Sequence, residues 1–152
     1  MTDQDFMARA LAEAKQAGLR GEVPVGAILV KGGEVIASGS NAVIALSDPT
    51  AHAEVLALRA AGQVLQNYRL PDCELFVTLE PCAMCAAAMI HARISRVVYG
   101  ASDPKTGAAG GLLNVFDTTF NHQTTVEGGV LATECGELLS NFFRTKRSLA
   151  KG

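Results

Sequence analysis

Two short motifs constrain this chain more than any other feature of its sequence. The first is His52-Ala53-Glu54, and the second is Pro81-Cys82-Ala83-Met84-Cys85. One imidazole and two thiols give a zinc ion three protein ligands, which is the number that a catalytic zinc site uses when its fourth position stays open for water. A structural zinc finger closes that position with a fourth side chain. The two motifs therefore predict a zinc site that is open on one side.

The second motif is predicted to follow a strand and to begin a helix. The segment Glu74 to Thr78 (Glu-Leu-Phe-Val-Thr) has the composition of a strand. Pro81 suits the first position of a helix, where its missing N–H costs nothing. Cys82 and Cys85 would then lie on one face of the first helical turn. A helix N-terminus and a bound metal both favour the thiolate, so both sulfurs would be suited to zinc.

The first motif is predicted to lie at the tip of a helix. His52 and Glu54 are two residues apart, so their side chains would diverge by about 200° on a continuous helix. Both can reach one metal site only at a helix end. Asp48-Pro49-Thr50 supplies such an end, because proline ends a preceding helix and Asp or Thr caps a helix that starts after it. We predict a helix from His52 to about Ala61, closed by Gly62.

The charges of this site indicate a role for Glu54. Two thiolates and a neutral imidazole cancel the +2 charge of zinc, and zinc lowers the pKa of a bound water toward roughly 7. A fourth protein ligand is not needed. Glu54 is therefore predicted to be the general acid and base, which takes a proton from the water and returns it to a ring nitrogen and then to a leaving amine.

Other interpretations of these residues are weaker. A Cys-x-x-C pair is often a redox pair, but a thioredoxin-type site does not require an upstream His-x-Glu. A phosphate-binding loop at Lys105-Thr106 is rejected, because the Walker pattern places its glycines before the lysine. A closed zinc site would need a fourth ligand, and no spare residue has a customary zinc-finger spacing. The spare residues are Cys73, His91, His122 and Cys135.

Length and composition predict one cytoplasmic domain, residues 1–152. The chain has 152 residues, of which 49% are hydrophobic, which suffices for a buried core. Its first five residues lack the charged and then apolar pattern of a signal peptide, and no apolar run approaches a membrane span. With two of the four cysteines assigned to zinc, a reducing cytosol fits better than a disulfide framework. Cys73 and Cys135 are expected to be buried free thiols.

The remaining segments predict a small sheet with helices. The strand after the Cys82 helix is reached through that helix, so it should run parallel to the strand before it, with a right-handed crossover. A glycine-rich loop, Asp103 to Gly111, is predicted to be flexible. The other predicted elements are a helix through Phe6–Ala17, a hairpin of Val25–Lys31 and Glu34–Ala37 around Gly32-Gly33, strands Arg96–Gly100 and Thr124–Glu127, and a helix from about Ala132.

The C-terminal tail is basic and begins beside two aromatic residues. The net charge of −2 argues against a nucleic-acid-binding surface spread over the whole chain, but it leaves room for a local patch. From Arg144 to Gly152 there are only basic charges, next to Phe142-Phe143. Such a combination suits a phosphate backbone and stacked bases. A solvated, frayed terminus is the alternative.

Taken together, the motifs resemble the bacterial tRNA-specific adenosine deaminases of the cytidine deaminase-like superfamily, over nearly the whole chain. The glycine-rich loop and the basic, aromatic tail are more specific to the tRNA enzymes than the zinc motifs are. The segments that carry the resemblance are Glu22-Val23-Pro24-Val25-Gly26-Ala27, Asp48-Pro49-Thr50-Ala51-His52-Ala53-Glu54, Gln66-Asn67-Tyr68-Arg69-Leu70, Val77-Thr78-Leu79-Glu80-Pro81-Cys82 and Lys105-Thr106-Gly107-Ala108-Ala109-Gly110.

The resemblance implies an α/β fold, a cytidine deaminase-like three-layer arrangement with a five-stranded mixed sheet flanked by helices. It implies a homodimer with one Zn²⁺ per subunit, held by His52, Cys82 and Cys85. The implied reaction is the hydrolytic conversion of adenosine to inosine at the wobble position of a tRNA anticodon, with Glu54 as the catalytic residue. The implied substrate-binding residues are Asn41, the Ala53 backbone, Asp103 and Lys105 on the glycine-rich loop, Asn121 on a nearby loop, and Phe143 and Arg147 in the tail.

Two other functions remain open at this point. A deaminase of a free nucleobase or nucleoside, of the guanine or cytosine type, would share the zinc site but would have no need of a basic tail. A zinc-stabilised RNA-binding module without activity would have no need of Glu54.

Overall fold

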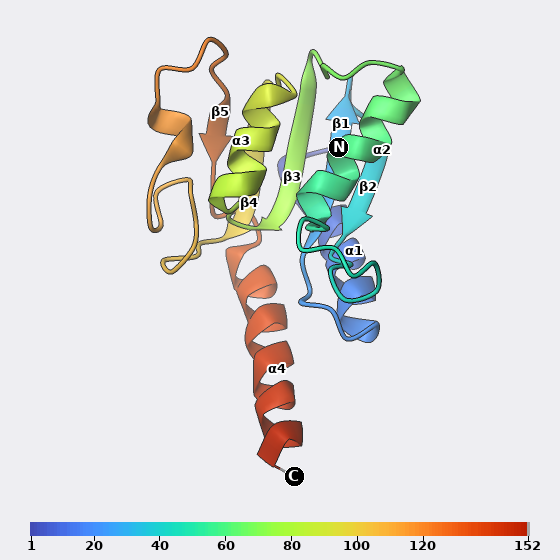
Figure 1. Ribbon diagram of the computed structural model, residues 1–152, viewed down its shortest axis with the longest axis vertical. Coiled ribbons are helices and arrows are strands. Elements are labelled where there is room, and N and C mark those ends of the chain that lie inside the picture. Colours follow the sequence, from blue (N-terminus) through green and yellow to red (C-terminus); the bar gives the residue numbers. More distant parts are fainter. Residues whose placement is uncertain (152) are drawn as a thin grey trace.

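The computed structural model describes residues 1–151; Gly152, the last residue of the predicted basic tail, lies outside the described residues. Helices and strands alternate along most of the described chain (Figure 1). The elements are α1 (Asp3–Leu19), β1 (Gly26–Lys31), β2 (Glu34–Ser40), α2 (Ala53–Leu65), β3 (Cys73–Leu79), α3 (Ala83–His91), β4 (Arg96–Ala101), the short 3₁₀ helix η1 (Val115–Asp117), β5 (Thr125–Glu127) and α4 (Ala132–Lys151).

The five strands form one mixed sheet in the order β2-β1-β3-β4-β5, as predicted. Strand β1 is antiparallel to both β2 and β3, whereas β3, β4 and β5 run parallel to one another. Because β3 and β4 are parallel, their carboxyl ends, Leu79 and Ala101, are paired at the same edge of the sheet. The segments that leave these two ends therefore start side by side.

Helices cover both faces of the sheet, which confirms the predicted three-layer arrangement. Successive side chains of a strand point to opposite faces. Leu75 and Val77 of β3 belong to the hydrophobic cluster that contains α2 and α3 residues. Phe76, between them, belongs to the opposite cluster, where its ring lies 5.1 Å from that of Phe6 on α1. The cluster on that face also contains Cys135 of α4, which is a buried free thiol, as predicted.

Two glycines let helices lie directly on the strands. A Cβ atom at Gly26 would lie 2.2 Å from the Ala10 carbonyl oxygen of α1. A Cβ atom at Gly39 would lie 2.4 Å from the Ala53 carbonyl oxygen at the start of α2. No side chain fits at either position. The absence of a side chain at Gly39 thus sets how close the N-terminal tip of α2, and with it the first motif, comes to the sheet.

Two predicted helix boundaries are wrong, and one strand extends into the segment that follows it. Helix α2 continues past Gly62 to Leu65, because a glycine destabilises a helix by only about 1 kcal/mol. The helix ends at Gln66, its C-cap, which has a left-handed φ of 52°. Helix α3 begins at Ala83 and not at Pro81, since the extended Cys82 is its N-cap. Strand β2 runs on to Ser40, because its pairing with β1 continues to that residue. No helix in the described part of the chain is long and apolar enough to cross a membrane.

Candidate active site

The three predicted zinc ligands meet where the first turns of α2 and α3 face each other. His52 is the N-cap of α2, Cys82 is the N-cap of α3, and Cys85 lies in the first turn of α3. The Nδ1 atom of His52 lies 3.6 Å from the Cys82 Sγ and 3.4 Å from the Cys85 Sγ. All three ligand atoms lie within 4.8 Å of one another.

This donor set fits a tetrahedral zinc ion. With Zn–N near 2.05 Å and Zn–S near 2.3 Å, a tetrahedral angle separates nitrogen from sulfur by about 3.6 Å. The observed separations, 3.6 and 3.4 Å, are close to that value. Three protein ligands of this kind form the candidate zinc site, and three is the number that leaves one position of the tetrahedron for a reacting molecule.

The pKa values of the two cysteine ligands are shifted in opposite directions. A hydrogen bond from the Cys85 thiol, with a smaller contribution from the nearby His52, lowers the pKa of Cys82 to about 5. The same hydrogen bond raises the pKa of Cys85, and burial raises it further. One thiolate is therefore already present at neutral pH, and binding of zinc would release the proton of the second.

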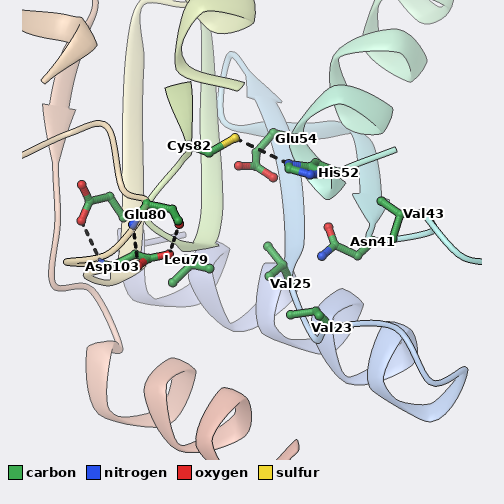
Figure 2. Close-up of a pocket in the computed structure, with 11 residues that line it drawn as sticks. Val23, Val25, Asn41, Val43, His52, Glu54, Leu79, Glu80, Cys82 and Asp103 are labelled. Carbon is green, nitrogen blue, oxygen red and sulfur yellow. Dashed lines mark hydrogen bonds between the residues drawn. The ribbon is translucent and has the colours of Figure 1, made fainter. Parts of the chain in front are cut away.

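Glu54 lies beside the ligands, on the first turn of α2 (Figure 2). The residue is only 4% exposed. Burial, with a smaller contribution from the Cys82 thiolate, raises the pKa of Glu54 to about 7 against the opposing effect of a backbone hydrogen bond. A bound cation would act in the opposite direction, because positive charge favours the carboxylate. A carboxyl group whose pKa lies near neutrality can both take and return a proton at the pH of the cell.

A pocket of about 210 Å³ opens in front of Glu54 and the zinc ligands His52 and Cys82. Most of its exposed surface is apolar, and four of its lining residues are aliphatic (Figure 2). Aliphatic walls with a few polar groups suit a flat, mostly apolar ring with polar edges. The aliphatic residues are Val23, Val25, Val43 and Leu79, and the polar residues that complete the lining are Asn41, Glu80, Asp103 and Thr106.

Asn41 is held in place at this pocket. Its Oδ1 accepts the N–H of Ala53 at 2.8 Å, and its own backbone N–H donates to the Val25 carbonyl. Because Oδ1 is engaged, the side-chain NH₂ group is the part of Asn41 that can serve a ligand. The Ala53 N–H is the donor in this bond, so a direct contact from it to a base would require Asn41 to release it.

Comparison with known proteins assigns the chain to a family. The cytidine and deoxycytidylate deaminase zinc-binding region matches residues 1–101. A tRNA-specific adenosine deaminase of Haemophilus influenzae is 50% identical over 151 residues, which cover 98% of this chain and 87% of the relative. The chain belongs to the tRNA-specific adenosine deaminase family. The corresponding protein of Bacillus subtilis is 47% identical over 150 residues, covering 98% of this chain and 93% of that relative.

Solved structures agree with the fold of this deaminase. A structure from work on A-to-I editing by tRNA:A34 deaminases at the wobble position is 48% identical, with a TM-score of 0.84, and the match covers 89% of this chain and 99% of that one. A guanine deaminase of Bacillus subtilis is 37% identical, with a TM-score of 0.66, and the match covers 97% and 95% of the two chains. The fold is thus shared by deaminases that differ in substrate.

One groove is lined by four of the residues that are predicted to contact RNA. This groove, of about 660 Å³, lies between the segment after β4 and the helix α4. Asp103 and Thr106 line both the groove and the pocket, so the two are neighbours. The four predicted residues are Asp103, Lys105, Phe143 and Arg147, and Ser140, Thr106 and Arg144 complete the lining.

Asn121 is not brought to this site. It precedes β5, whose Thr125 pairs with Arg96 at the amino end of β4, whereas the pocket lies at the carboxyl ends of β3 and β4. The Nε2 atom of the neighbouring His122 lies 2.7 Å from the Ile94 carbonyl oxygen, before β4 begins. Figure 1 shows this segment at the upper end of the sheet, opposite α4. Asn121 therefore lines neither the pocket nor the groove within one chain, and its contact with RNA stays a prediction.

Sequence reasoning missed two buried acidic residues that hold the walls of the pocket. Glu22, 1% exposed, accepts the N–H groups of Ile44 and Ala45 and so fixes the segment after β2. Glu80, 3% exposed, accepts N–H groups from the segment after β4. The available signal was an acidic residue inside an otherwise apolar stretch, because a buried charge requires partners.

Proposed function

We propose that this deaminase hydrolyses adenosine to inosine at the wobble position of a tRNA anticodon, with one zinc ion per subunit. The observation that carries the proposal is that the pocket in front of Glu54 adjoins a basic groove, with which it shares the lining residues Asp103 and Thr106. An RNA backbone in the groove would then have one base within reach of the zinc site. An anticodon loop suits this arrangement, because its unpaired bases can be turned outward at modest cost.

Different residues of the chain have different roles in the proposed reaction. Zinc, when bound, is a Lewis acid that lowers the pKa of water and so makes a nucleophile available. Glu54 takes the two protons of the attacking water in turn and delivers one to the ring nitrogen and the other to the amino group. The amino group leaves as ammonia, and the oxygen of the water becomes the carbonyl oxygen of inosine. Asn41 offers its NH₂ group to the nucleotide, and the aliphatic walls hold the faces of the base.

Deamination of a free nucleobase is the second candidate, and the guanine deaminase that is 37% identical favours it. Such an enzyme has no use for the groove at α4. An anticodon stem-loop with adenosine at the wobble position separates the two. We expect inosine at that position, as measured by mass spectrometry of the digested RNA. In a separate incubation with free guanine or cytosine we expect no release of ammonia. Turnover of a free base without inosine in the stem-loop would refute the proposal.

Binding of the stem-loop should weaken as salt rises, because each phosphate contact releases counterions. Lys105 and Arg147 both line the groove. We expect Lys105→Ala and Arg147→Ala each to reduce the slope of log K against log salt by about 1. Lys31→Ala is the matched control, since Lys31 pairs with Cys73 at the other end of the sheet. Slopes equal to that of the wild type in both groove variants would rule out phosphate contacts there.

The further elements of the proposal concern assembly and location. We propose a homodimer of single-domain subunits, residues 1–152, that works in the cytoplasm, where its tRNA substrate is. A groove of about 460 Å³ between α2 and α3 supports the dimer, because apolar side chains line it and Tyr68 beside it is 82% exposed. The apolar lining is Val55, Leu58, Leu70, Ala88 and Ala92.

A further inference from the structure

The segment between β4 and η1 wraps around one carboxylate. Glu80 follows the last residue of β3, and both of its oxygens accept backbone N–H groups of this segment. Figure 2 shows Glu80 beside Asp103, one of the donor residues. Oε1 accepts the N–H of Asp103 at 2.9 Å. Oε2 accepts the N–H groups of Ala109 at 2.9 Å and Gly111 at 2.8 Å. Three donors from two ends of one loop therefore converge on a side chain that is 3% exposed.

Two glycines make this wrapping possible. A Cβ atom at Gly107 would lie 2.3 Å from the Cδ of Glu80. A Cβ atom at Gly111 would lie 2.1 Å from the Asp103 carbonyl oxygen and 3.0 Å from the Glu80 Oε1. Backbone N–H groups that converge on an anion form a nest, and such a nest needs residues without side chains where the backbone closes in. Gly107 and Gly111 thus allow the backbone of the loop to approach the Glu80 carboxylate.

The loop held in this way carries residues that face the substrate. Asp103 and Thr106 line the pocket, and Lys105 lines the groove. The carboxylate of Asp103 bonds inside the loop, to the N–H groups of Lys105 and Thr106. The loop is therefore ordered within itself, and the bonds of Glu80 fix it relative to β3. Since β3 also leads to Cys82, one strand sets the positions of both the loop and a zinc ligand.

We propose that Glu80 is a positioning residue for substrate binding, whose carboxylate holds the loop 103–111 so that Asp103, Lys105 and Thr106 meet the nucleic acid. This inference rests on the proposed function. Both oxygens of Glu80 are used by backbone donors, so Glu80 contributes to affinity, and the proton transfer is left to Glu54. The expected signature of a loss at Glu80 is thus a change in KM with little change in kcat.

Glu80→Gln is the direct test. Glutamine keeps the size of the side chain but has one acceptor oxygen, and its NH₂ group faces at least one N–H of the loop. We expect KM for the anticodon stem-loop to rise about tenfold, as the loss of one charge-assisted hydrogen bond allows, with kcat within about twofold of the wild type. Zinc content should equal that of the wild type. A fall in kcat at unchanged KM, or a loss of zinc, would overturn the proposal.

Gly107→Ala tests the same contact from the side of the loop, which matters if Glu80→Gln folds poorly. Its new Cβ would push on the Glu80 carboxylate. Both variants break one interaction, so their effects on KM should not add in the double variant. Gly136→Ala is the control, since its Cβ would come no closer than 4.0 Å to the Cβ of Ala101 on β4. Additive effects, or an equal rise of KM in the control, would contradict the assignment.

A measurement without RNA separates this inference from the proposed function. Amide hydrogen exchange of Asp103, Ala109 and Gly111 reports whether Glu80 holds these N–H groups. In Glu80→Gln we expect exchange to become at least about tenfold faster at Asp103 or at the pair Ala109 and Gly111, with no change in α1. Exchange as slow as in the wild type at all three amides would overturn the role of Glu80. A wild-type protein that leaves the stem-loop unchanged would refute the proposed function alone.

Discussion

Glu54→Ala will reduce kcat for deamination by about 10² to 10⁴, the range that general acid and base catalysis contributes. The variant should keep its zinc, because the ligands are His52, Cys82 and Cys85 and the carboxylate is not among them. It should also fold, because the side chain that is removed lies in a pocket and leaves no packed core empty. Single-turnover rates on the stem-loop, with zinc content measured on the same sample, give both results.

The matched control for this prediction is Glu54→Gln. It keeps the volume of the side chain, but its amide cannot take up and return a proton as the Glu54 carboxyl group does. The two variants should therefore be slow to a similar degree, and both should bind the stem-loop with nearly the wild-type affinity. If either variant turns over at the wild-type rate, the proton is carried by another group and the assignment of Glu54 fails.

The zinc site could be predicted from sequence because its residues are local. His52 and Glu54 are separated by one residue, and Cys82 and Cys85 by two, so each pair is placed by one helix start. Because one imidazole and two thiols are typical zinc ligands, the two pairs could be predicted to meet at one ion. The errors there were small: Cys82 caps α3 and does not lie inside it, but a sulfur at the N-cap still reaches the ligand position.

The supports of the site could not be predicted, because they depend on tertiary contacts. The glycines at 107 and 111 look like the composition of a flexible loop until the carboxylate of Glu80 is placed between them. Asn121 was implied by the resemblance alone, and it lines neither the pocket nor the groove, so its role stays a prediction. Hydrogen bonds between segments far apart in the chain decide how the loop is held.

Cys82→Ala will remove zinc binding, activity and the stability that depends on the metal, all at once. Two ligands remain, and two do not make a zinc site of high affinity. A metal that binds only the folded chain stabilises it by about 2.7 kcal/mol when its free concentration is a hundred times the Kd. We therefore expect zinc to raise the melting temperature of the metal-free wild type but not that of Cys82→Ala. Calorimetry with and without zinc, together with metal analysis, tests this.

Cys135→Ala is the control that separates loss of metal from loss of packing. Cys135 is a buried thiol in the cluster on the other face of the sheet, against α1, whereas Cys82 is only partly buried. Its replacement should lower the free energy of unfolding by about 1 kcal/mol through lost burial, with zinc content and kcat unchanged. If Cys82→Ala instead retained about one zinc per chain, another side chain would hold the metal, and the assigned ligand set of His52, Cys82 and Cys85 would be wrong.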